Sequence, residues 1–364
     1  QGTQVMQYGS GQGEPRIREQ ICEVMRLEGI EAHPDDVVVT TGSSGAFTLI
    51  FLAAPGDESA QVELTHNWDT SSYDLGKGYG HIAISTPDIH ATLGKLAEQG
   101  IDAVVHCAAK IIVPESVDEP LTYYENNVGK TVKLLQGMQR NGVHRILFSS
   151  SASIYATDDE FKVTEDSALD PGSPYATTKF MVEHILRDAA HASDLKALSL
   201  RYFNPIGSDP KLRTSQQIEH PTHVLGKMID AWMEDSTFTV TGVEWPTRDG
   251  SGIRDFIHVW DLAQAHVAAL EHLDEVTVDE PYQVFNIGTG NGVTVKELVK
   301  AFEEGTGKAL NVVYGPPRPG DVAGAYTVSH RAKDLLGWSA ELTPADGIRD
   351  AIAWLPRRKE ILGY

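Results

Sequence analysis

Residues 145–155 read RILFSSSASIY, a short apolar run that ends in three successive serines. Runs of this kind, apolar throughout and rich in branched side chains, are typical of strands buried on both faces of a parallel sheet. With residues 145–150, four further runs predict buried strands: DVVVTT at 36–41, AVVHC at 103–107, ALSLRY at 197–202 and QVFNI at 283–287.

Amphipathic stretches lie between these runs. Residues 89–98, for example, place Ile89, Leu93 and Leu96 on one face at helical spacing. Strands that alternate with helices predict a parallel sheet covered on both faces, which is the doubly wound α/β or Rossmann class. The other predicted helices cover residues 128–138, 175–186, 261–270 and 295–302.

The alternating pattern also predicts a division of the chain. Residues 204–222 are polar, contain Pro and Gly, and predict a long loop. The segments after this loop are expected to build a smaller lobe over the carboxyl edge of the sheet. The prediction is an atypical N-terminal extension at 1–35, a dinucleotide-binding domain at 36–203 with 256–290 returning to it, and a substrate-binding lobe at 204–255 and 291–364.

Composition narrows the classes of function and partner. The 364 residues carry a net charge of −21, which repels phosphate backbones and argues against a nucleic-acid partner. The two cysteines, Cys22 and Cys107, predict no disulfide framework and fit a reducing, cytoplasmic compartment. No apolar run reaches the length of a membrane span, and the polar start predicts no signal peptide.

Residues 173–179 read SPYATTK, which places Tyr175 and Lys179 on one face at the start of a predicted helix. A tyrosine with a pKa of about 10 is a poor base at neutral pH. A neighbouring ammonium stabilises the phenolate, so the pair could exchange a proton with a substrate hydroxyl. Taken alone, Tyr and Lys four residues apart on a helix are more often a surface pair.

Ser151 strengthens the functional interpretation of this pair. It follows a predicted strand, and ligands bind at the carboxyl ends of parallel strands. Its hydroxyl could hydrogen-bond the same substrate oxygen that Tyr175 deprotonates. A serine-rich turn at a strand end is common, but the order of strand, three serines and then Tyr-x-x-x-Lys favours a site.

Further motifs follow in one order along the chain: HCAA at 106–109, PESV at 114–117, YYENNV at 123–128, RYFNP at 201–205, DGSGIRD at 249–255, FNIGTG at 285–290 and RPGD at 318–321. Together with the strand-end serines and residues 173–179, they resemble the UDP-glucose 4-epimerase family of extended short-chain dehydrogenases. The resemblance runs from about residue 86 onwards.

The resemblance implies an isomerase that interconverts UDP-galactose and UDP-glucose by transient oxidation at C4 with tightly bound NAD. Tyr175 would be the base, Lys179 would bind the nicotinamide ribose and tune Tyr175, and Ser151 would assist proton transfer. The cofactor carries the redox chemistry, while the protein supplies geometry and electrostatics. The resemblance also implies a homodimer through two helices on the flank of the sheet.

The resemblance implies two sets of contacts and no metal site. Arginine suits the diphosphate of the substrate because its fork pairs with phosphate in two places, although Arg254 alone could equally be a structural ion pair. The implied cofactor contacts are Gly42, Gly45, Asn67, Asp88, Ile89, Ala108, Ala109, Asn127, Ser149, Tyr175, Lys179 and Tyr202. The implied substrate contacts are Ser151, Tyr175, Asn204, His223, Arg254, Arg318, Asp321 and Ala325.

One position bears on the choice of sugar. Four residues past Asp321, the family has a residue that controls the space beside the 2-substituent of the sugar. Ala325 occupies this position and is small, which resembles members that also accept N-acetylated UDP-hexosamines. A shift of one residue to Tyr326 would reverse that prediction.

The N-terminal part departs from the family pattern of Gly-x-x-Gly-x-x-Gly after the first strand. Residues 36–48 read DVVVTTGSSGAFT, in which Gly42 and Gly45 match and Thr48 replaces the third glycine. Glycines in this loop let the backbone approach a pyrophosphate at a helix N-terminus. Residues 9–13 (GSGQG) are a rival with poorer spacing and no clear preceding strand.

Other positions in this region match the family unevenly. His66 precedes Asn67 where the family has an aspartate that binds the adenosine ribose, and Ile111 stands where many members have a cofactor-contacting lysine. Asp88 and Ile89 resemble the adenine-contacting pair.

Two short stretches resemble other families. Residues 7–46 resemble a class I pyridoxal-phosphate aminotransferase, and residues 55–84 resemble glyoxalase I, in which Glu63 and His81 would bind metal. The chain has no room for the large aminotransferase domain, and no second copy of the glyoxalase motif supplies further ligands. The simplest interpretation is a composite N-terminus.

Three alternatives to the epimerase remain. Another sugar-nucleotide enzyme of the same family is less favoured, because dehydratases usually carry Asp-Glu where Ala152 and Ser153 follow Ser151 here. A non-catalytic nucleotide-sugar-binding fold would result if the altered N-terminus could not hold NAD. A metal lyase or a pyridoxal enzyme would require the N-terminal resemblances to dominate.

Overall fold

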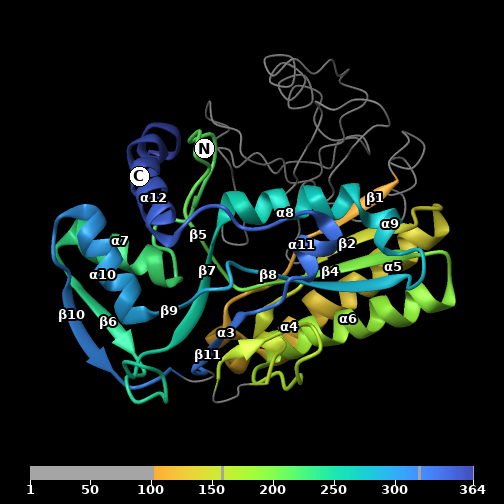
Figure 1. Ribbon diagram of the computed structural model, residues 1–364, viewed down its shortest axis with the longest axis horizontal. Helices are drawn as coiled ribbons and strands as arrows, with labels where there is room; N and C mark the ends of the chain where they lie inside the picture. The colour runs from red at the N-terminus through yellow and green to blue at the C-terminus, as the bar shows by residue number, and fades with distance from the viewer. Residues whose placement is uncertain (1–101, 157–159, 319–320, 364) are drawn as a thin grey trace, which may run out of the picture.

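The computed structural model describes residues 102–156, 160–318 and 321–363 (Figure 1). None of the helices in these ranges is both long enough and apolar enough to span a membrane. Several predictions fall outside the described residues: the extension at 1–35, the strand at 36–41, the helix at 89–98, and the site residues Gly42, Gly45, Asn67, Asp88 and Ile89.

Four parallel strands form the main described sheet, in the order β1-β2-β4-β8. All four were predicted as buried strands. Because the strands are parallel, their carboxyl ends meet at one edge of the sheet. The strands are β1 (Ala103–His106), β2 (Arg145–Ser149), β4 (Lys196–Tyr202) and β8 (Tyr282–Ile287).

Successive side chains along these strands enter two different cores. Val104 and Ile146 pack with one set of helices, while Val105 and Leu147 pack with the other set. This is why the runs contain consecutive apolar residues rather than apolar residues at alternate positions only. The first set is α5 (Lys130–Arg140) and α6 (Pro174–Ala192). The second set is α8 (Val259–Glu271), α9 (Leu273–Val276) and α11 (Arg331–Leu336).

Helices therefore cover both faces of the parallel sheet, with α5 and α6 below it and α8 and α11 above it in Figure 1. This confirms the doubly wound α/β class. The sequence at the beginning of α6 explains why the helix starts there. Ser173 accepts a hydrogen bond from the main-chain nitrogen of Ala176, and Pro174 occupies the first turn, where its missing N–H costs nothing.

The predicted helix at 128–138 is confirmed over α5, but its start is wrong. The π-helix η2 (Tyr124–Gly129) precedes α5 and follows two short helices. Asn127 is buried in this turn and uses its side-chain amide to bind neighbouring segments. A π-turn of this kind accommodates an extra residue and is frequent at functional sites. The short helices are α3 (Val113–Asp118) and α4 (Pro120–Tyr123).

A second sheet extends beyond the first one, in the order β3-β11-β7-β5, with β9 antiparallel to β7. A separate pair, β10 and β6, is parallel. The strands of the second sheet are β3 (Lys162–Val163), β11 (Gly324–Thr327), β7 (Ile253–His258), β5 (Asn204–Ile206) and β9 (Gly292–Thr294). The separate pair is β6 (Thr237–Thr241) and β10 (Asn311–Gly315).

The predicted loop at 204–222 is wrong in its first three residues, which form β5. Asn204 lies opposite Phe256, and Pro205 lies opposite Ile257. The strand is at the edge of its sheet, so the missing N–H of Pro205 breaks no inner hydrogen-bond ladder. Strand β5 thus places Asn204 directly after the carboxyl end of β4.

Three further helices pack around the second sheet and share a core with it. Phe256 from β7 packs there with Leu298, Phe302 and Ile348. The cap of α10 is a reciprocal capping box between Thr294 and Glu297. The helices are α7 (Val224–Glu234), α10 (Val295–Thr306) and α12 (Pro344–Leu362).

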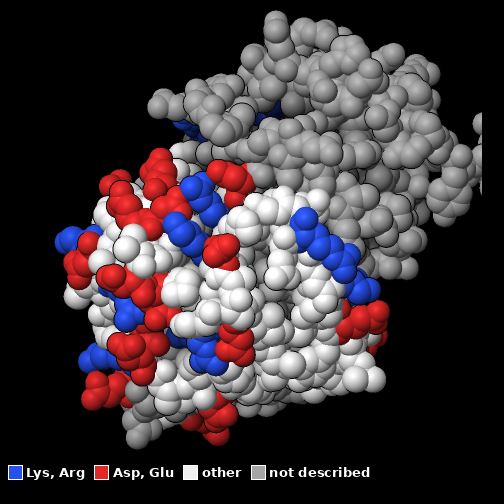
Figure 2. Space-filling view, turned by 90° about the vertical axis from the view of Figure 1, so that its right-hand side faces the viewer, with Lys and Arg blue, Asp and Glu red and all other residues white. Residues whose placement is uncertain are grey.

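In Figure 2, charged side chains of both signs are intermixed on the left of the described surface, and the part to the right carries few charges.

Candidate active site

The carboxyl edge of the main sheet brings together the first group of predicted residues. The predicted cofactor contacts Ser149 and Tyr202 are the last residues of β2 and β4, and His106 of the HCAA motif is the last residue of β1. The first turns of α6, which carry Tyr175 and Lys179, lie against the end of β2. Residues that are distant in sequence therefore share one edge of the fold.

Lys179 is almost fully buried at this edge, with 2% of its surface exposed. Its Nζ donates to the main-chain oxygen of Ser149 at 2.7 Å. The ammonium lies 4.8 Å from the ring centroid of Phe148 and 5.9 Å from that of Tyr175. Burial lowers the pKa of Lys179 to about 8, although Cys107 and Glu183 oppose this change.

Burial raises the pKa of the Tyr175 phenol above its ordinary value, although a side-chain hydrogen bond with Ser151 lowers it in part. The net direction is opposite to the one expected from a neighbouring ammonium, because loss of solvent outweighs the favourable contacts. The hydrogen bond shows that the hydroxyls of Tyr175 and Ser151 lie together. The phenol therefore needs further positive charge nearby to act as a base near neutral pH.

Ser151 is held in place by the short 3-10 helix η3 (Ala152–Ile154), which it caps. Its Oγ accepts a hydrogen bond from the main-chain nitrogen of Ser153 at 3.2 Å and lies 2.9 Å from the Ser153 hydroxyl. The serine-rich turn thus has a structural role, and the same turn orients the Ser151 hydroxyl toward Tyr175.

Ser149 is the centre of a polar cluster that the sequence did not predict. Its Oγ lies 3.0 Å from Sγ of Cys107 and 3.2 Å from Nε2 of His266, and it hydrogen-bonds the Tyr202 hydroxyl. Nδ1 of His266 donates to the main-chain oxygen of Leu262, so Nε2 is the acceptor in the neutral ring. His266 comes from α8, and no local motif marks it.

Asn127 fastens the segment after β1 to α6. Its Oδ1 accepts from the main-chain nitrogen of Lys110 at 2.8 Å, and its Nδ2 donates to the Lys110 oxygen and to Thr178 Oγ1, both at 3.0 Å. Ala108 and Ala109 lie half-buried in the fastened segment. Asn127 therefore shapes the backbone that the resemblance assigns to the cofactor.

Lys110 lies one position before Ile111, where many family members have a lysine. Its Nζ pairs with Glu115 at 2.5 Å and lies 5.4 Å from the ring centroid of Tyr123. Ile111 itself is 65% exposed. The lysine of this chain is thus directed toward α3 and α4.

The second group of predicted residues surrounds β7 and β11. Arg254 donates to the main-chain oxygens of Ala323 at 2.6 Å, Ile253 at 2.8 Å and Val322 at 2.9 Å. Burial lowers the pKa of Arg254, since these partners are neutral carbonyls. The structural ion pair considered for Arg254 is therefore replaced by main-chain contacts. Ala325 lies opposite Arg254 in the paired strands.

Arg318 and Asp321 form an ion pair next to this group. The guanidinium reaches both carboxylate oxygens at 3.1 Å. Asp321 and Arg318 both act on the pKa of Arg254, which places all three charges close together. One carboxylate and two guanidinium groups leave a net positive charge, and a diphosphate would complement it.

Asn204 and His223 complete the predicted substrate residues. Asn204 begins β5, two residues after Tyr202 ends β4, so this segment joins the two groups. His223 is exposed and caps α7, where its Nδ1 accepts from the main-chain nitrogen of Gly226 at 3.2 Å.

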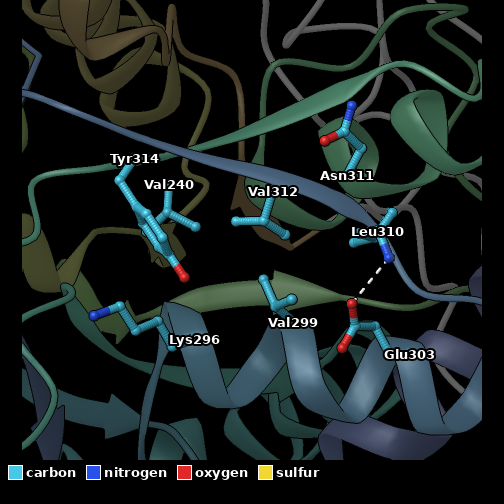
Figure 3. A pocket seen from close by; sticks show the side chains of 8 residues that line it. All are labelled: Val240, Lys296, Val299, Glu303, Leu310, Asn311, Val312 and Tyr314. Atoms are coloured by element: carbon cyan, nitrogen blue, oxygen red, sulfur yellow. Dashed lines mark hydrogen bonds between the residues drawn. The ribbon is translucent and has the colours of Figure 1, made fainter.

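A hollow of about 480 Å³ lies elsewhere, between α10 and the β6–β10 pair (Figure 3). Its polar side chains are engaged by the protein, since Glu303 accepts from the main-chain nitrogen of Leu310 and Lys296 donates to the main-chain oxygen of Asp249. It contains none of the predicted site residues. The hollow therefore does not coincide with the candidate active site, whose residues lie at the carboxyl edge of the main sheet. Within the described ranges, no cluster of His, Cys, Asp and Glu could hold a metal ion.

A Rossmann-type sheet with Tyr175, Lys179 and Ser151 at its carboxyl edge defines a nucleotide-dependent enzyme of the short-chain dehydrogenase class. Residues 40–288 match the NAD dependent epimerase/dehydratase family. The chain belongs to this family.

The chain is similar to several characterised members. UDP-glucose 4-epimerase 3 of Oryza sativa subsp. japonica is 37% identical over 355 residues, covering 93% of each chain. UDP-glucose 4-epimerase of Bacillus subtilis (strain 168) is 35% identical over 341 residues, covering 90% of this chain and 98% of the relative.

Solved structures agree with this placement. UDP-glucose-4-epimerase from Stenotrophomonas maltophila, with bound NAD and formylated UDP-arabinopyranose, has a TM-score of 0.71 at 35% identity, covering 77% of this chain and 84% of that one. UDP-glucose 4-epimerase from Bifidobacterium longum, in complex with NAD+ and UDP, has a TM-score of 0.69 at 36% identity, covering 76% and 83%.

Proposed function

We propose that this protein interconverts UDP-galactose and UDP-glucose by reversible oxidation at C4, with NAD as the bound cofactor. The observation that carries the proposal is the buried Lys179 beside Tyr175, with Ser151 hydrogen-bonded to the phenol, at the carboxyl edge of a parallel sheet. Epimerases with these activities are similar over most of the chain. The further resemblances at residues 7–46 and 55–84 lie outside the described residues.

The residues at this edge suit a nicotinamide nucleotide. The Lys179 ammonium has three N–H donors, and the Ser149 oxygen takes one, which leaves donors for the ribose hydroxyls. The buried phenol of Tyr175 needs added positive charge, which an oxidised nicotinamide ring would supply. Lys179, Tyr175 and Asn127 would hold NAD, which would supply the hydride acceptor and donor for C4 of the sugar.

Residues of the protein accept the proton of the 4-hydroxyl and later return it. Tyr175 takes this proton as the hydride leaves, and Ser151 holds the same oxygen in place. Lys179 stabilises the phenolate of Tyr175 and orients the ribose. The proton returns from Tyr175 when the 4-keto sugar is reduced, so the phenolate is regenerated in each cycle.

The second group would hold the nucleotide part of the substrate. Arg254 and Arg318 bind the diphosphate, and their net positive charge beside Asp321 favours it. Asn204 and His223 complete the contacts to the UDP part. We also propose the division into the dinucleotide-binding domain and the substrate-binding lobe at the boundaries expected from the sequence.

The assay for this proposal is conversion of UDP-galactose to UDP-glucose by the purified protein, with detection of NAD released on denaturation. Turnover without added cofactor is the expected result, because the nucleotide stays bound. A protein that carries no NAD and converts neither sugar would contradict the proposal and favour a binding fold without catalysis.

The size of residue 325 is expected to control the choice of sugar. Ala325 leaves space beside the 2-substituent, so UDP-N-acetylglucosamine should be converted at a rate comparable to that of UDP-galactose. Ala325→Tyr should lower kcat/KM for the N-acetylated sugar by about 10- to 100-fold, since a lost pocket volume of this kind costs about 1–3 kcal/mol. Conversion of UDP-galactose should change little.

Val328→Tyr is the control for this substitution. Val328 is exposed and directly follows β11, the strand that contains Ala325, so the control adds the same ring close by in the chain. Poor turnover of UDP-N-acetylglucosamine by the unaltered protein, far below that of UDP-galactose, would rule out the role of Ala325.

We further infer a homodimer and a cytoplasmic location. The exposed apolar side chains Val117, Leu121 and Met181 lie on α3, α4 and α6, and the resemblance implies pairing through two helices on the flank of the sheet. Sedimentation of the purified protein at several concentrations tests the assembly, and a monomer at micromolar concentration would contradict it.

A further inference from the structure

A buried ion pair lies behind the site and takes no part in the chemistry described above. Glu183 on α6 and Arg201 on β4 have side chains that are 4% and 5% exposed. Nη2 of Arg201 donates to Oε2 of Glu183 at 2.6 Å, and Nε donates to Oε1 at 2.9 Å. This two-point geometry fixes the carboxylate as well as neutralising it.

The Glu183–Arg201 pair is bound to the same end of β2 as Lys179. Ser150 donates its hydroxyl to Glu183, while Lys179, one turn earlier on α6, donates to the main-chain oxygen of Ser149. Helix α6 is therefore bound to the last residue of β2 and to the residue that follows it, and the next residue is Ser151. A shift of Glu183 would change the spacing between Ser151 and the helix that carries Tyr175.

Arg201 also connects the pair to neighbouring elements. Its Nη1 donates to the Tyr155 hydroxyl at 2.9 Å, and Tyr155 donates to Oδ1 of Asn286 at 2.6 Å. Glu183 is thus held by β4 directly and, through Tyr155, by the end of β8.

Several titratable groups face Lys179 from the surrounding elements. His106, at the end of β1, is kept neutral because burial lowers its pKa to about 3. Cys107 follows β1, and Tyr175 and Glu183 lie on α6 itself. Among the groups that act on the ammonium in the described ranges, Glu183 is the carboxylate.

We propose that Glu183 and Arg201 form a positioning pair, in which Glu183 holds the Lys179 turn of α6 against β2 and Arg201 cancels the charge of Glu183 at the phenol of Tyr175. The proposal rests on the epimerase function given above. Neither residue touches substrate or cofactor, so each acts through Lys179 and Tyr175.

Removing one charge from the pair should shift the pH dependence in a direction set by the charge that remains. Glu183→Gln leaves Arg201 unpaired, favours the phenolate, and should move the acidic limb of kcat to lower pH. Arg201→Gln leaves Glu183 unpaired and should move the limb to higher pH. Tyr175 and Glu183 are eight residues apart. At about 12 Å and an effective dielectric constant of about 20, each shift should be about one pH unit.

The double Glu183→Gln/Arg201→Gln variant should return the limb close to its original midpoint, because no unpaired charge remains. Arg201→Lys keeps the charge but loses the two-point geometry, so kcat should fall while the midpoint stays. The proposal would be overturned if Glu183→Gln and Arg201→Gln moved the acidic limb of kcat in the same direction, or if neither moved it. A pair with only a structural role has no reason to move the limb in opposite directions.

A second measurement does not depend on turnover. The ultraviolet absorbance of the phenolate, taken as the difference between each variant with Tyr175 and the same variant with Tyr175→Phe, reports the ionisation of Tyr175 directly. In each variant, the pH midpoint of this ionisation should shift in the same direction as the acidic limb of kcat. If the unaltered protein does not epimerise sugars, the proposed function fails, and this titration still decides the role of the pair.

Controls separate the pair from general effects on α6. Asp188→Asn removes an exposed charge from the same helix and should leave both midpoints unchanged. A buried unpaired charge destabilises a protein strongly, so a single variant can fail to fold. In that case the double variant and Arg201→Lys carry the test, and a displaced midpoint in either one contradicts the proposal.

Discussion

Tyr175→Phe is expected to reduce kcat for epimerisation by about 10³-fold, within the range that a positioned proton-transfer group contributes. The substitution deletes one hydroxyl and leaves the ring, so the packing at the start of α6 persists. Affinity for UDP should remain within about 2-fold, because this hydroxyl belongs to the reacting end of the substrate. Steady-state rates, together with calorimetric binding of UDP, measure the two effects.

The matched control is Tyr314→Phe, which removes a phenol from the distant hollow shown in Figure 3. That variant should retain full activity. Equal activity in Tyr175→Phe would end the proposed role of Tyr175, and an equal loss of UDP binding would mean that the hydroxyl serves binding instead.

Lys179→Met is expected to reduce kcat by about 10²- to 10³-fold, because it removes the ammonium that stabilises the phenolate. Loss of the bond to the Ser149 oxygen also frees the first turns of α6 from β2. The acidic limb of the residual activity should move to higher pH, since the phenol loses its cationic neighbour. Assay of the variant across a pH series checks both expectations.

Lys179→Met also tests how the buried ammonium affects the free energy of unfolding. Burial lowers the pKa of Lys179 to about 8 from an ordinary 10.5, so the unfolded chain binds more protons between these pH values. The buried ammonium therefore destabilises the native state below pH 8, and this cost disappears as pH rises toward 10.5. Between pH 7 and pH 10.5, the unaltered protein should gain about 3 kcal/mol relative to Lys179→Met.

Denaturant unfolding at the two pH values measures that difference. Arg140→Met, a substitution at the exposed end of α5, is the control that should show no such change with pH. A constant difference in free energy of unfolding would mean that Lys179 is not held in a pKa-lowering environment.

The strands and helices of the main sheet could be predicted because their signals are local. Residues 145–150 and 197–202 are rich in apolar side chains, and the helix that begins at Pro174 has a serine cap and an early proline. The π-turn at Tyr124–Gly129 was missed, because no side-chain periodicity distinguishes it from an α-helix. Strand β5 was missed because its three residues hold a proline and pair only with the distant β7.

The site could be predicted only in part. Ser151, Tyr175 and Lys179 were recognisable from their order along the chain, and the structure brings them to one edge. The partners that hold them were not recognisable. Cys107 and His266 reach Ser149 from two other elements, and no spacing in the sequence connects them.

The sequence by itself determined the strands and helices of the main sheet and which residue types carry the chemistry. Hydrophobic periodicity and caps depend on neighbours a few residues away, so they can be read along the chain. Only the tertiary structure decided that Lys179 is a weakened base, that Arg254 binds carbonyls, and that Glu183 is paired with Arg201. Burial and pairing depend on segments that meet in space, and their effect on charge has no local signature in the sequence.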